Sequence, residues 1–258
     1  MILDVQRLSF TIQDKKILTD VSCSVQKGTF LGLIGSNGSG KSTLLKMMYR
    51  YLKPSSGLVV MDEQDIWKMP EKSYAKEVAV VSQESPVIFD FSVRELILMG
   101  RTPHKKLFAR DTEEDLRIVE ECMSLADITH LADRQFSNLS GGEKKRVTVA
   151  RALAQQTDVL ILDEPTNHLD IEHQLQLMDL IRDLPITIIA ALHDLNLAAA
   201  YCDELLVLKN GTIHCHGTPK EILTTEKIRD IFRVESVITI DEQTNRPHIQ
   251  YISNRKRG

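Results

Sequence analysis

The first 25 residues of the chain alternate between apolar and polar positions. The apolar positions are Ile2, Val5, Leu8, Phe10 and Ile12, followed by an apolar-rich stretch over residues 17–25. A two-residue period is typical of antiparallel strands that bury one face and leave the other in solvent. The pattern therefore predicts that the chain begins with an antiparallel β-sheet.

Four later segments are short and continuously apolar. They cover residues 30–34, 78–81, 159–162 and 186–192, and a glycine or a polar residue follows each of them. Runs of this kind are typical of strands that are buried on both faces of a parallel sheet. Because helical patterns separate the runs, the sequence predicts an α/β layer architecture.

The segment from Ser92 to Gln156 has helical spacing of its apolar residues, as at Val93, Leu96 and Ile97. This block is predicted to be all-helical. The rest of the chain returns to mixed structure. The predicted elements are a helix over 196–201, a strand over 205–208 with a hairpin turn at Asn210-Gly211, a helical stretch over 219–232 and two short strands at 237–240 and 249–252.

Composition excludes several classes of protein. The 258 residues include 36 acidic and 32 basic side chains, so the formal net charge of −4 supplies no overall basic field for binding nucleic acid. The longest apolar runs are far shorter than the roughly 20 residues that span a bilayer, and the first residues carry no secretory pattern. The four cysteines form no CxxC pair, which favours a reducing compartment.

Residues 35–43, with the sequence GSNGSGKST, match the phosphate-loop pattern GxxxxGK[ST]. The motif follows a buried strand and precedes a helical run, as the mechanism requires. Its glycines let the backbone N–H groups converge on an anion, and the helix start adds the positive end of its dipole. Lys41 would reach the outer phosphates and Ser42 would bind Mg²⁺, whereas a ligand-free glycine-rich turn would need neither.

Asp163 and Glu164 end the apolar run 159–162. Adjacent residues on a strand point to opposite sides. Asp163 can therefore face Mg²⁺ through water while Glu164 polarises an attacking water molecule. The alternative is a pair of acids that cap the next helix.

Residues 139–143, with the sequence LSGGE, open a predicted helix. A serine and two glycines at a helix start can form a second anion site, because the first N–H groups of a helix lack partners within it. From these residues alone, a plain N-cap at Ser140 with flanking glycines is an equally open interpretation.

Together, the three motifs resemble those of the nucleotide-binding subunit of ABC transporters, in the family's order and spacing and over essentially the whole chain. Residues 35–43 resemble its Walker A motif, 159–164 its Walker B motif and 139–143 its signature. The resemblance implies a P-loop NTPase (RecA-like) α/β core with an N-terminal antiparallel β subdomain and an inserted helical subdomain. The implied domains are an ATP-binding core over 1–84 and 157–220, a helical signature subdomain over 85–156 and a C-terminal extension over 221–258.

The resemblance also implies which residues bind ATP and Mg²⁺. The phosphate-binding residues are Gly35, Ser36, Asn37, Gly38, Ser39, Gly40, Lys41, Ser42 and Thr43. The Mg²⁺ ligands are Ser42, Asp163 and Gln83, which matches the Q-loop, and the catalytic residues are Lys41, Glu164 and the switch histidine His193. Without the resemblance, a histidine after an apolar strand is more often a capping residue. Residues 167–170 look like the D-loop.

The adenine site departs from the family pattern. The family usually places an aromatic residue near the start of the chain, where this chain has Ile12. Phe10 lies two residues earlier and would share the face of Ile12 in a regular strand. Apolar packing of Ile12 against the base, with looser base selectivity, is therefore the prediction.

The resemblance further implies a head-to-tail homodimer, in which Ser140, Gly141 and Gly142 of one copy close over the ATP of the other. Its partners would be two integral membrane permease subunits and, through the complex, an extracytoplasmic substrate-binding protein, with no nucleic acid. The implied location is peripheral, on the cytoplasmic face of the cell membrane.

Segments outside the shared motifs, at 92–96, 99–104, 169–174 and 193–196, resemble the ATPases of importers for iron siderophore, haem and cobalamin. Iron siderophore is the favoured cargo, with haem and cobalamin close behind. The alternative is a soluble ABC ATPase in translation or Fe–S cluster assembly. The translation type usually joins two cassettes in one chain, and this chain has one phosphate loop.

Overall fold

The structure is a computed structural model that describes residues 2–82, 90–106 and 109–253. The chain forms two compact units, a first unit of residues 1–68 with 187–258 and a second unit of residues 69–186. In the described residues, no helix has both the length and the apolar character needed to cross a bilayer. The predicted domain limits at residues 84, 156 and 220 stay a prediction.

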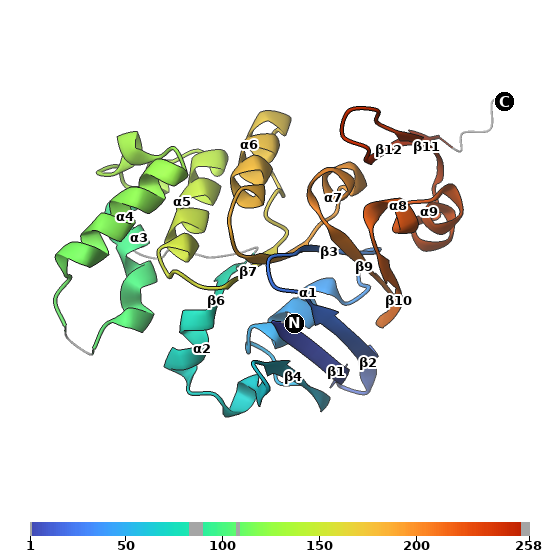
Figure 1. The fold of residues 1–258 in the computed structure, drawn as a ribbon, viewed down its shortest axis with the longest axis horizontal. Helices are drawn as coiled ribbons and strands as arrows, with labels where there is room; N and C mark the ends of the chain where they lie inside the picture. The colour runs from blue at the N-terminus through green and yellow to red at the C-terminus, as the bar shows by residue number, and fades with distance from the viewer. Residues whose placement is uncertain (1, 83–89, 107–108, 254–258) are drawn as a thin grey trace. The chain divides into compact units, whose positions relative to one another are not determined.

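The first unit contains most of the strands. Its elements are β1 (Leu3–Ile12), β2 (Lys15–Val25), β3 (Phe30–Ile34), α1 (Lys41–Met48), β4 (Ser56–Met61), β5 (Gln64–Asp65), a 3₁₀ turn (Ile66–Lys68), β8 (Thr187–Ala191), α7 (Leu195–Tyr201), β9 (Glu204–Lys209), β10 (Thr212–Gly217), α8 (Pro219–Ile222), α9 (Thr225–Phe232), β11 (Glu235–Ile240) and β12 (Pro247–Ile252). The strands β2, β1, β4 and β5 lie side by side in that order as an antiparallel sheet (Figure 1), which confirms the predicted start of the chain.

The strand β3 is the centre of the first unit. All five of its residues are buried, and it pairs in parallel with β8 on one side and with β9 on the other. Leu33 lies opposite Ala191 and Leu206 in this register. The continuous apolar run 30–34 is thereby explained, because both faces of the strand are covered.

Two predictions for the first unit concern a hairpin turn and a helical stretch. Asn210 and Gly211 join β9 to β10 with φ angles of 51° and 78°, which is the left-handed turn that the dipeptide predicts. The stretch 219–232, expected to be helical, is instead two helices. Thr224 separates them because its hydroxyl caps α9, accepting a hydrogen bond of 3.3 Å from the N–H of Lys227.

The second unit contains most of the helices. Its elements are α2 (Glu71–Glu77), β6 (Val78–Val81), α3 (Val93–Leu98), a 3₁₀ segment (Met99–His104), α4 (Glu113–Leu125), two 3₁₀ turns (Thr129–Leu131 and Phe136–Asn138), α5 (Gly141–Leu153), β7 (Val159–Asp163) and α6 (Ile171–Arg182). The two strands β6 and β7 pair in parallel, as their apolar runs predict.

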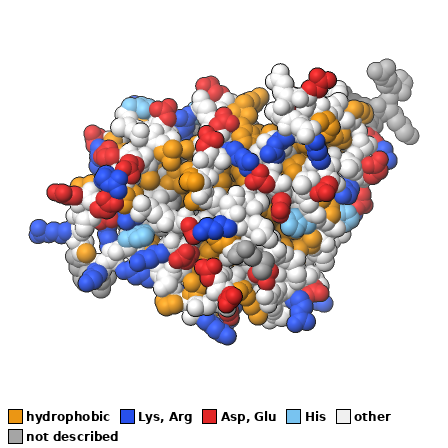
Figure 2. All heavy atoms as spheres, viewed as in Figure 1, with side chains coloured by type: hydrophobic (Ala, Val, Ile, Leu, Met, Phe, Trp, Pro, Cys, Tyr) orange, Lys and Arg blue, Asp and Glu red, His pale blue; other side chains and the backbone are white. Residues whose placement is uncertain are grey.

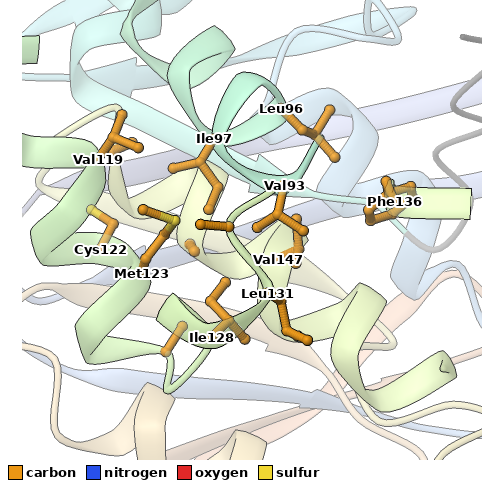
Figure 3. Packing of buried hydrophobic residues seen from close by; sticks show 14 of the residues in the cluster. Val93, Leu96, Ile97, Val119, Cys122, Met123, Ile128, Leu131, Phe136 and Val147 are labelled. Atoms are coloured by element: carbon orange, nitrogen blue, oxygen red, sulfur yellow. The ribbon is translucent and has the colours of Figure 1, made fainter. Parts of the chain in front are cut away.

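A hydrophobic cluster holds the helices α3, α4 and α5 together (Figure 3). Val93, Ile97, Val119, Met123 and Val147 are among its fully buried members. Full burial of such side chains stabilises a fold by about 1.5–3 kcal/mol each. The predicted helical block therefore has a core of its own.

The surface agrees with the charge balance of the sequence. On the face shown in Figure 2, acidic and basic side chains are interspersed. With 36 acidic and 32 basic residues in the chain, the composition is in keeping with this mixture of charges.

Candidate functional site

The phosphate loop lies between β3 and α1 in the first unit. Gly35, Gly38 and Gly40 have φ angles of 148°, 75° and 105°, a region that residues with a side chain rarely adopt. A Cβ atom on Gly35 would lie 2.2 Å from the carbonyl oxygen of Leu208, so this glycine is required by space as well as by conformation. The loop is therefore held in a tight curl by its own glycines.

Lys41 is the first residue of α1 and is 5% exposed. Its ammonium group donates to the carbonyl oxygens of Gly35, at 2.9 Å, and Ser36, at 3.3 Å. The side chain thus folds back over its own loop. A buried positive charge is positioned beside the backbone that the sequence predicts to cradle phosphate.

Ser39 gives an independent test of whether the loop fits an anion. The residue is 2% exposed, and its hydroxyl oxygen finds no hydrogen-bond partner in the part of the chain that the structure describes. Its carbonyl accepts a bond of 3.1 Å from the N–H of Gly211. A buried polar group left without a partner costs about 1–3 kcal/mol, and a phosphate oxygen is an acceptor that would remove this cost.

His193 follows β8 at the same edge of the sheet as the phosphate loop. The N–H of Leu192 donates to the carbonyl of Leu33 at 3.0 Å, so the segments after β3 and β8 leave the sheet together. The side chain of Asp194 caps α7, accepting hydrogen bonds from the N–H groups of Asn196 and Leu197 at 2.7 and 3.0 Å. The N-cap of α7 is therefore Asp194 and not His193, whose side chain is exposed.

Ile12 ends β1 with 50% of its surface exposed. Phe10 is partly buried, and the pairing of β1 with β2 shifts register between Phe10 and Thr11. The strand pairing is thus irregular where the two side chains were expected to share a face. Contact of Ile12 with adenine stays a prediction.

Asp163 and Glu164 lie in the second unit, at the end of the fully buried strand β7. Asp163 is 3% exposed, and Glu164 has a φ of 53°. A left-handed residue other than glycine costs about 1–3 kcal/mol, and Glu164 is one of 14 such residues in the part of the chain that the structure describes. The side chain of Asn167 donates to the carboxylate of Glu164 and fixes its direction.

The next helix, α6, does not use these carboxylates as caps. Its N-cap is Asp170, whose side chain accepts a bond of 2.9 Å from the N–H of His173. The capping alternative for Asp163 and Glu164 is therefore wrong.

Ser140 caps α5 in a capping box. Its hydroxyl accepts from the N–H of Glu143 at 3.3 Å, and the carboxylate of Glu143 accepts from the N–H of Ser140 at 2.7 Å. These hydrogen bonds lower the pKa of Glu143. The N-cap interpretation is thus correct for the isolated chain, but it leaves the hydroxyl proton of Ser140 as a possible donor to a further acceptor.

Lys145 and His173 are two residues that the motifs did not indicate. Lys145 is half-buried on α5; burial lowers its pKa, while the negative charges of Asp163 and Glu164 raise it. Lys145 lies three residues after the buried Gly142, so both are on the inward face of α5. This helical spacing is visible in the sequence. His173 packs on Gly142, a contact between distant residues that no sequence pattern shows.

The predicted site residues thus fall into two groups. Lys41, Ser39 and His193 lie in the first unit, and Asp163, Glu164 and Ser140 lie in the second. The structure describes no group of three or more histidine, cysteine or acidic residues that could hold a metal ion. Ser42 and Asp163 offer oxygen atoms, which are the donors that Mg²⁺ prefers. Gln83 lies outside the described residues.

A glycine-rich loop between a buried parallel strand and a helix, with a buried lysine folded over it, defines an α/β domain of the nucleotide-binding class. The model of the ABC transporter family matches residues 18–167, which are more than half of the chain. The chain belongs to the ABC transporter family.

Two curated relatives and one solved structure show where the likeness extends. The cobalamin import ATP-binding protein BtuD of Halobacterium salinarum is 40% identical over 95% of this chain, which spans 62% of the length of that relative. The iron(3+)-hydroxamate import ATP-binding protein FhuC of Bacillus subtilis is 37% identical over 95% of this chain and 93% of its own. A chain from an inward-facing metal-chelate type ABC transporter has a TM-score of 0.85 at 28% identity, covering 98% of this chain and 97% of that one.

Proposed function

We propose that this chain is the ATP-hydrolysing subunit that powers an ABC importer. In this proposal two copies pair head to tail and work with two integral membrane permease subunits at the cytoplasmic face of the membrane. An extracytoplasmic substrate-binding protein delivers the cargo to that complex. Family membership and the likeness to the import ATP-binding relatives support it.

The observation that carries the proposal is the phosphate loop with Lys41 folded over it. The lysine ammonium donates to the carbonyls of Gly35 and Ser36. When ATP binds, Lys41 exchanges these carbonyls for phosphate oxygens, and the loop N–H groups and Ser39 hydroxyl complete the cradle. The positive charge of Lys41 therefore lies beside the loop that is expected to bind the phosphates.

Ser42 and Asp163 each carry an oxygen donor of the kind that Mg²⁺ prefers, and the ion, when bound, would neutralise charge on the outer phosphates. Hydrolysis itself requires positioning of water and stabilisation of charge. Glu164, held by Asn167, orients the attacking water, while Lys41 and His193 offset charge on the transferred phosphoryl group.

The signature completes the site of a second copy. Ser140, Gly141 and Gly142 present a hydroxyl and the first N–H groups of α5 to the γ-phosphate of the partner's ATP. Dimer closure then depends on that phosphate, and its loss favours reopening. This coupling converts hydrolysis into a cycle of closure and opening.

The proposed cargo is an iron(III) siderophore, with haem or cobalamin as the other candidates. The segments at 92–104 and 169–174 support this cargo class, as do the names of the relatives, which act on iron(3+)-hydroxamate and cobalamin.

The proposal is tested by the nucleotide affinity of Lys41→Ala. We expect a loss of at least about 100-fold, because a charge-assisted bond to phosphate contributes roughly 1.5–3 kcal/mol and the loop geometry is also disturbed. Lys46→Ala is the matched control, since Lys46 lies on the same helix α1 and packs over the ring of Tyr51. Unchanged affinity in Lys41→Ala would contradict the proposal.

Co-purification separates the importer from the soluble ABC ATPases of translation or Fe–S cluster assembly. We expect the tagged chain to isolate a polytopic membrane protein in detergent. Association with ribosomes, or with Fe–S assembly proteins and no permease, would support the alternative.

A further inference from the structure

The segment after α9 forms a two-stranded antiparallel sheet, β11 and β12 with the connecting residues 241–246, which we call the C-terminal hairpin. It lies next to the helix α7 (Figure 1). None of the nucleotide-binding motifs falls in this hairpin. Its contacts with α7, the helix that follows His193, suggest a role.

The hairpin is bonded to the first turn of α7. The side-chain amide of Asn196 accepts from the backbone N–H of Ile249 at 2.7 Å and donates to the carbonyl of the same residue at 3.2 Å. This amide makes the pair of bonds that a neighbouring strand residue would make with β12. Ile249 itself is 2% exposed, so the bonds are shielded from water.

The hairpin also holds the other end of α7. The guanidinium of Arg246 donates to the carbonyl of Ala199, at 3.0 Å, and to that of Cys202. Carbonyls at the C-terminal end of a helix carry a partial negative charge and lack partners within the helix, so a cation is stabilising there. The same guanidinium lies 4.0 Å from Asp203, which accepts from the N–H of Phe30 at the start of β3.

His193 lies between two fixed points of the backbone. Before it, Leu192 is bonded to β3; after it, Asp194 caps α7. Burial, and then the negative charge of Asp194, raise the pKa of the hydroxyl of Tyr251 in the hairpin. A displacement of α7 therefore moves the backbone that carries His193.

Two features argue against a purely stabilising role for the hairpin. Four of its apolar side chains are about half exposed, namely Val237, Ile240, Tyr251 and Ile252 at 45–50%, so it adds little buried core. The helix α7 has seven residues, and helices shorter than about 12 residues are marginal without tertiary contacts. Its position therefore depends on its tertiary contacts, which are those with β3 and α8 as well as those with the hairpin.

We propose that the C-terminal hairpin is a positioning element for His193, which it fixes by holding α7 at both ends through Asn196 and Arg246. The proposal deepens the proposed function and rests on it, because it assumes that His193 acts on the γ-phosphate of ATP. Asn196 and Arg246 are positioning residues, since neither belongs to the phosphate loop or to the strand ends that carry the site.

The test compares Asn196→Ala and Arg246→Met with the wild-type full-length chain in steady-state ATP turnover. We expect kcat to fall about 10-fold to 100-fold, since a misplacement of about 1 Å at a catalytic group costs roughly 100-fold. The KM for ATP should change less than about twofold, because the phosphate loop keeps its own contacts. Arg246→Lys should recover part of the loss, since it keeps a donor and the charge.

Arg229→Gln is the matched control. Arg229 makes two bonds of 2.6 Å to Glu235 within the C-terminal segment and none of the bonds to α7 described above. Its loss should leave kcat unchanged. A second readout is the NMR signal of the His193 imidazole, assigned with His193→Gln among the 8 histidines, which should shift in Asn196→Ala and stay fixed in Arg229→Gln.

An unchanged kcat with an unmoved His193 signal in both α7-contact variants would overturn the proposal. Equal losses in Arg229→Gln would also overturn it, because they would indicate general destabilisation. A wild-type chain that hydrolyses no ATP would contradict the proposed function instead, while the NMR comparison would still decide whether the hairpin positions His193.

Discussion

The imidazole of His173 occupies the space that a side chain on Gly142 would need. A Cβ atom on this glycine would lie 2.2 Å from Cδ2 of the ring. The ring is itself oriented by Asp170, whose carboxylate lies 2.6 Å from Nδ1. The start of α5 therefore packs directly on the first turn of α6, which follows the segment that resembles the D-loop.

Gly142→Ala should consequently displace either His173 or the first turn of α5. We expect the chain to fold and to keep its affinity for ATP, because the phosphate loop is untouched. Turnover should fall about 10-fold or more, since the proposed γ-phosphate donors of the signature lose their alignment. The measurement is kcat beside nucleotide affinity in the same preparation.

Gly141→Ala supplies the control for that variant. Apart from its chain neighbours and the backbone of its own helix, no described atom lies within 4 Å of a Cβ at Gly141, so this variant adds a methyl group to the signature without crowding His173. The double variant Gly142→Ala/His173→Ala should recover turnover, because the obstructing ring is gone. If the double variant is as impaired as the single one, crowding by His173 is not the cause.

Glu164→Gln removes a charge and keeps the size of the side chain. We expect ATP to bind and turnover to fall by about 100-fold to 10,000-fold, the usual contribution of a general base. A lasting ATP-bound dimer should accumulate, as seen by size-exclusion chromatography with ATP. Steady-state turnover close to that of the wild type would contradict the role assigned to Glu164.

The buried pair of Arg101 and Asp115 should control acid stability of the second unit. Both residues are 5% exposed, and their side chains are 2.9 Å apart. Burial alone raises the pKa of Asp115, but hydrogen bonds from Arg101 and Thr112 outweigh it and lower the pKa to about 2. Because the pKa is depressed in the folded chain, the stabilisation is present above about pH 4 and is lost as pH falls toward 2.

Arg101→Met leaves the carboxylate of Asp115 buried without its cation. We expect a loss of about 3–5 kcal/mol in the free energy of unfolding at pH 7, measured by urea denaturation. The exposed Arg117, which pairs with Glu114 and Glu121, is the control: Arg117→Met should cost far less, because solvent screens exposed ion pairs. Equal effects of the two substitutions would contradict the importance of burial.

Local chemistry made much of this fold predictable. The strand over 30–34 and the loop over 35–43 are predictable from a few adjacent residues. A strand that is buried on both faces needs a continuous apolar run, and a tight loop needs glycines. Thr224 was harder, because a single capping hydroxyl divides a stretch with helical composition. The predicted helix of 219–232 missed that break.

Long-range contacts were not predictable from the sequence. Asn196 and Ile249 are 53 positions apart, and their bonds depend on a fold that brings β12 to α7. Gly142 and His173 belong to different helices in the same way. Neither contact follows from residue type or spacing, because each requires the tertiary arrangement first.

The turn at Asn210 and Gly211 has a consequence for engineering the chain. Surface hairpin turns normally tolerate inserted peptides and new chain ends. Here the N–H of Gly211 donates to the carbonyl of Ser39 in the phosphate loop. The carbonyl of Gly211 accepts from the N–H of Thr19 at 2.8 Å. Insertion of an affinity tag, a fluorescent reporter or new chain ends at this turn would break the hydrogen bond that holds the phosphate loop. The connection over 241–246 is a more tolerant place, provided that Arg246 is kept.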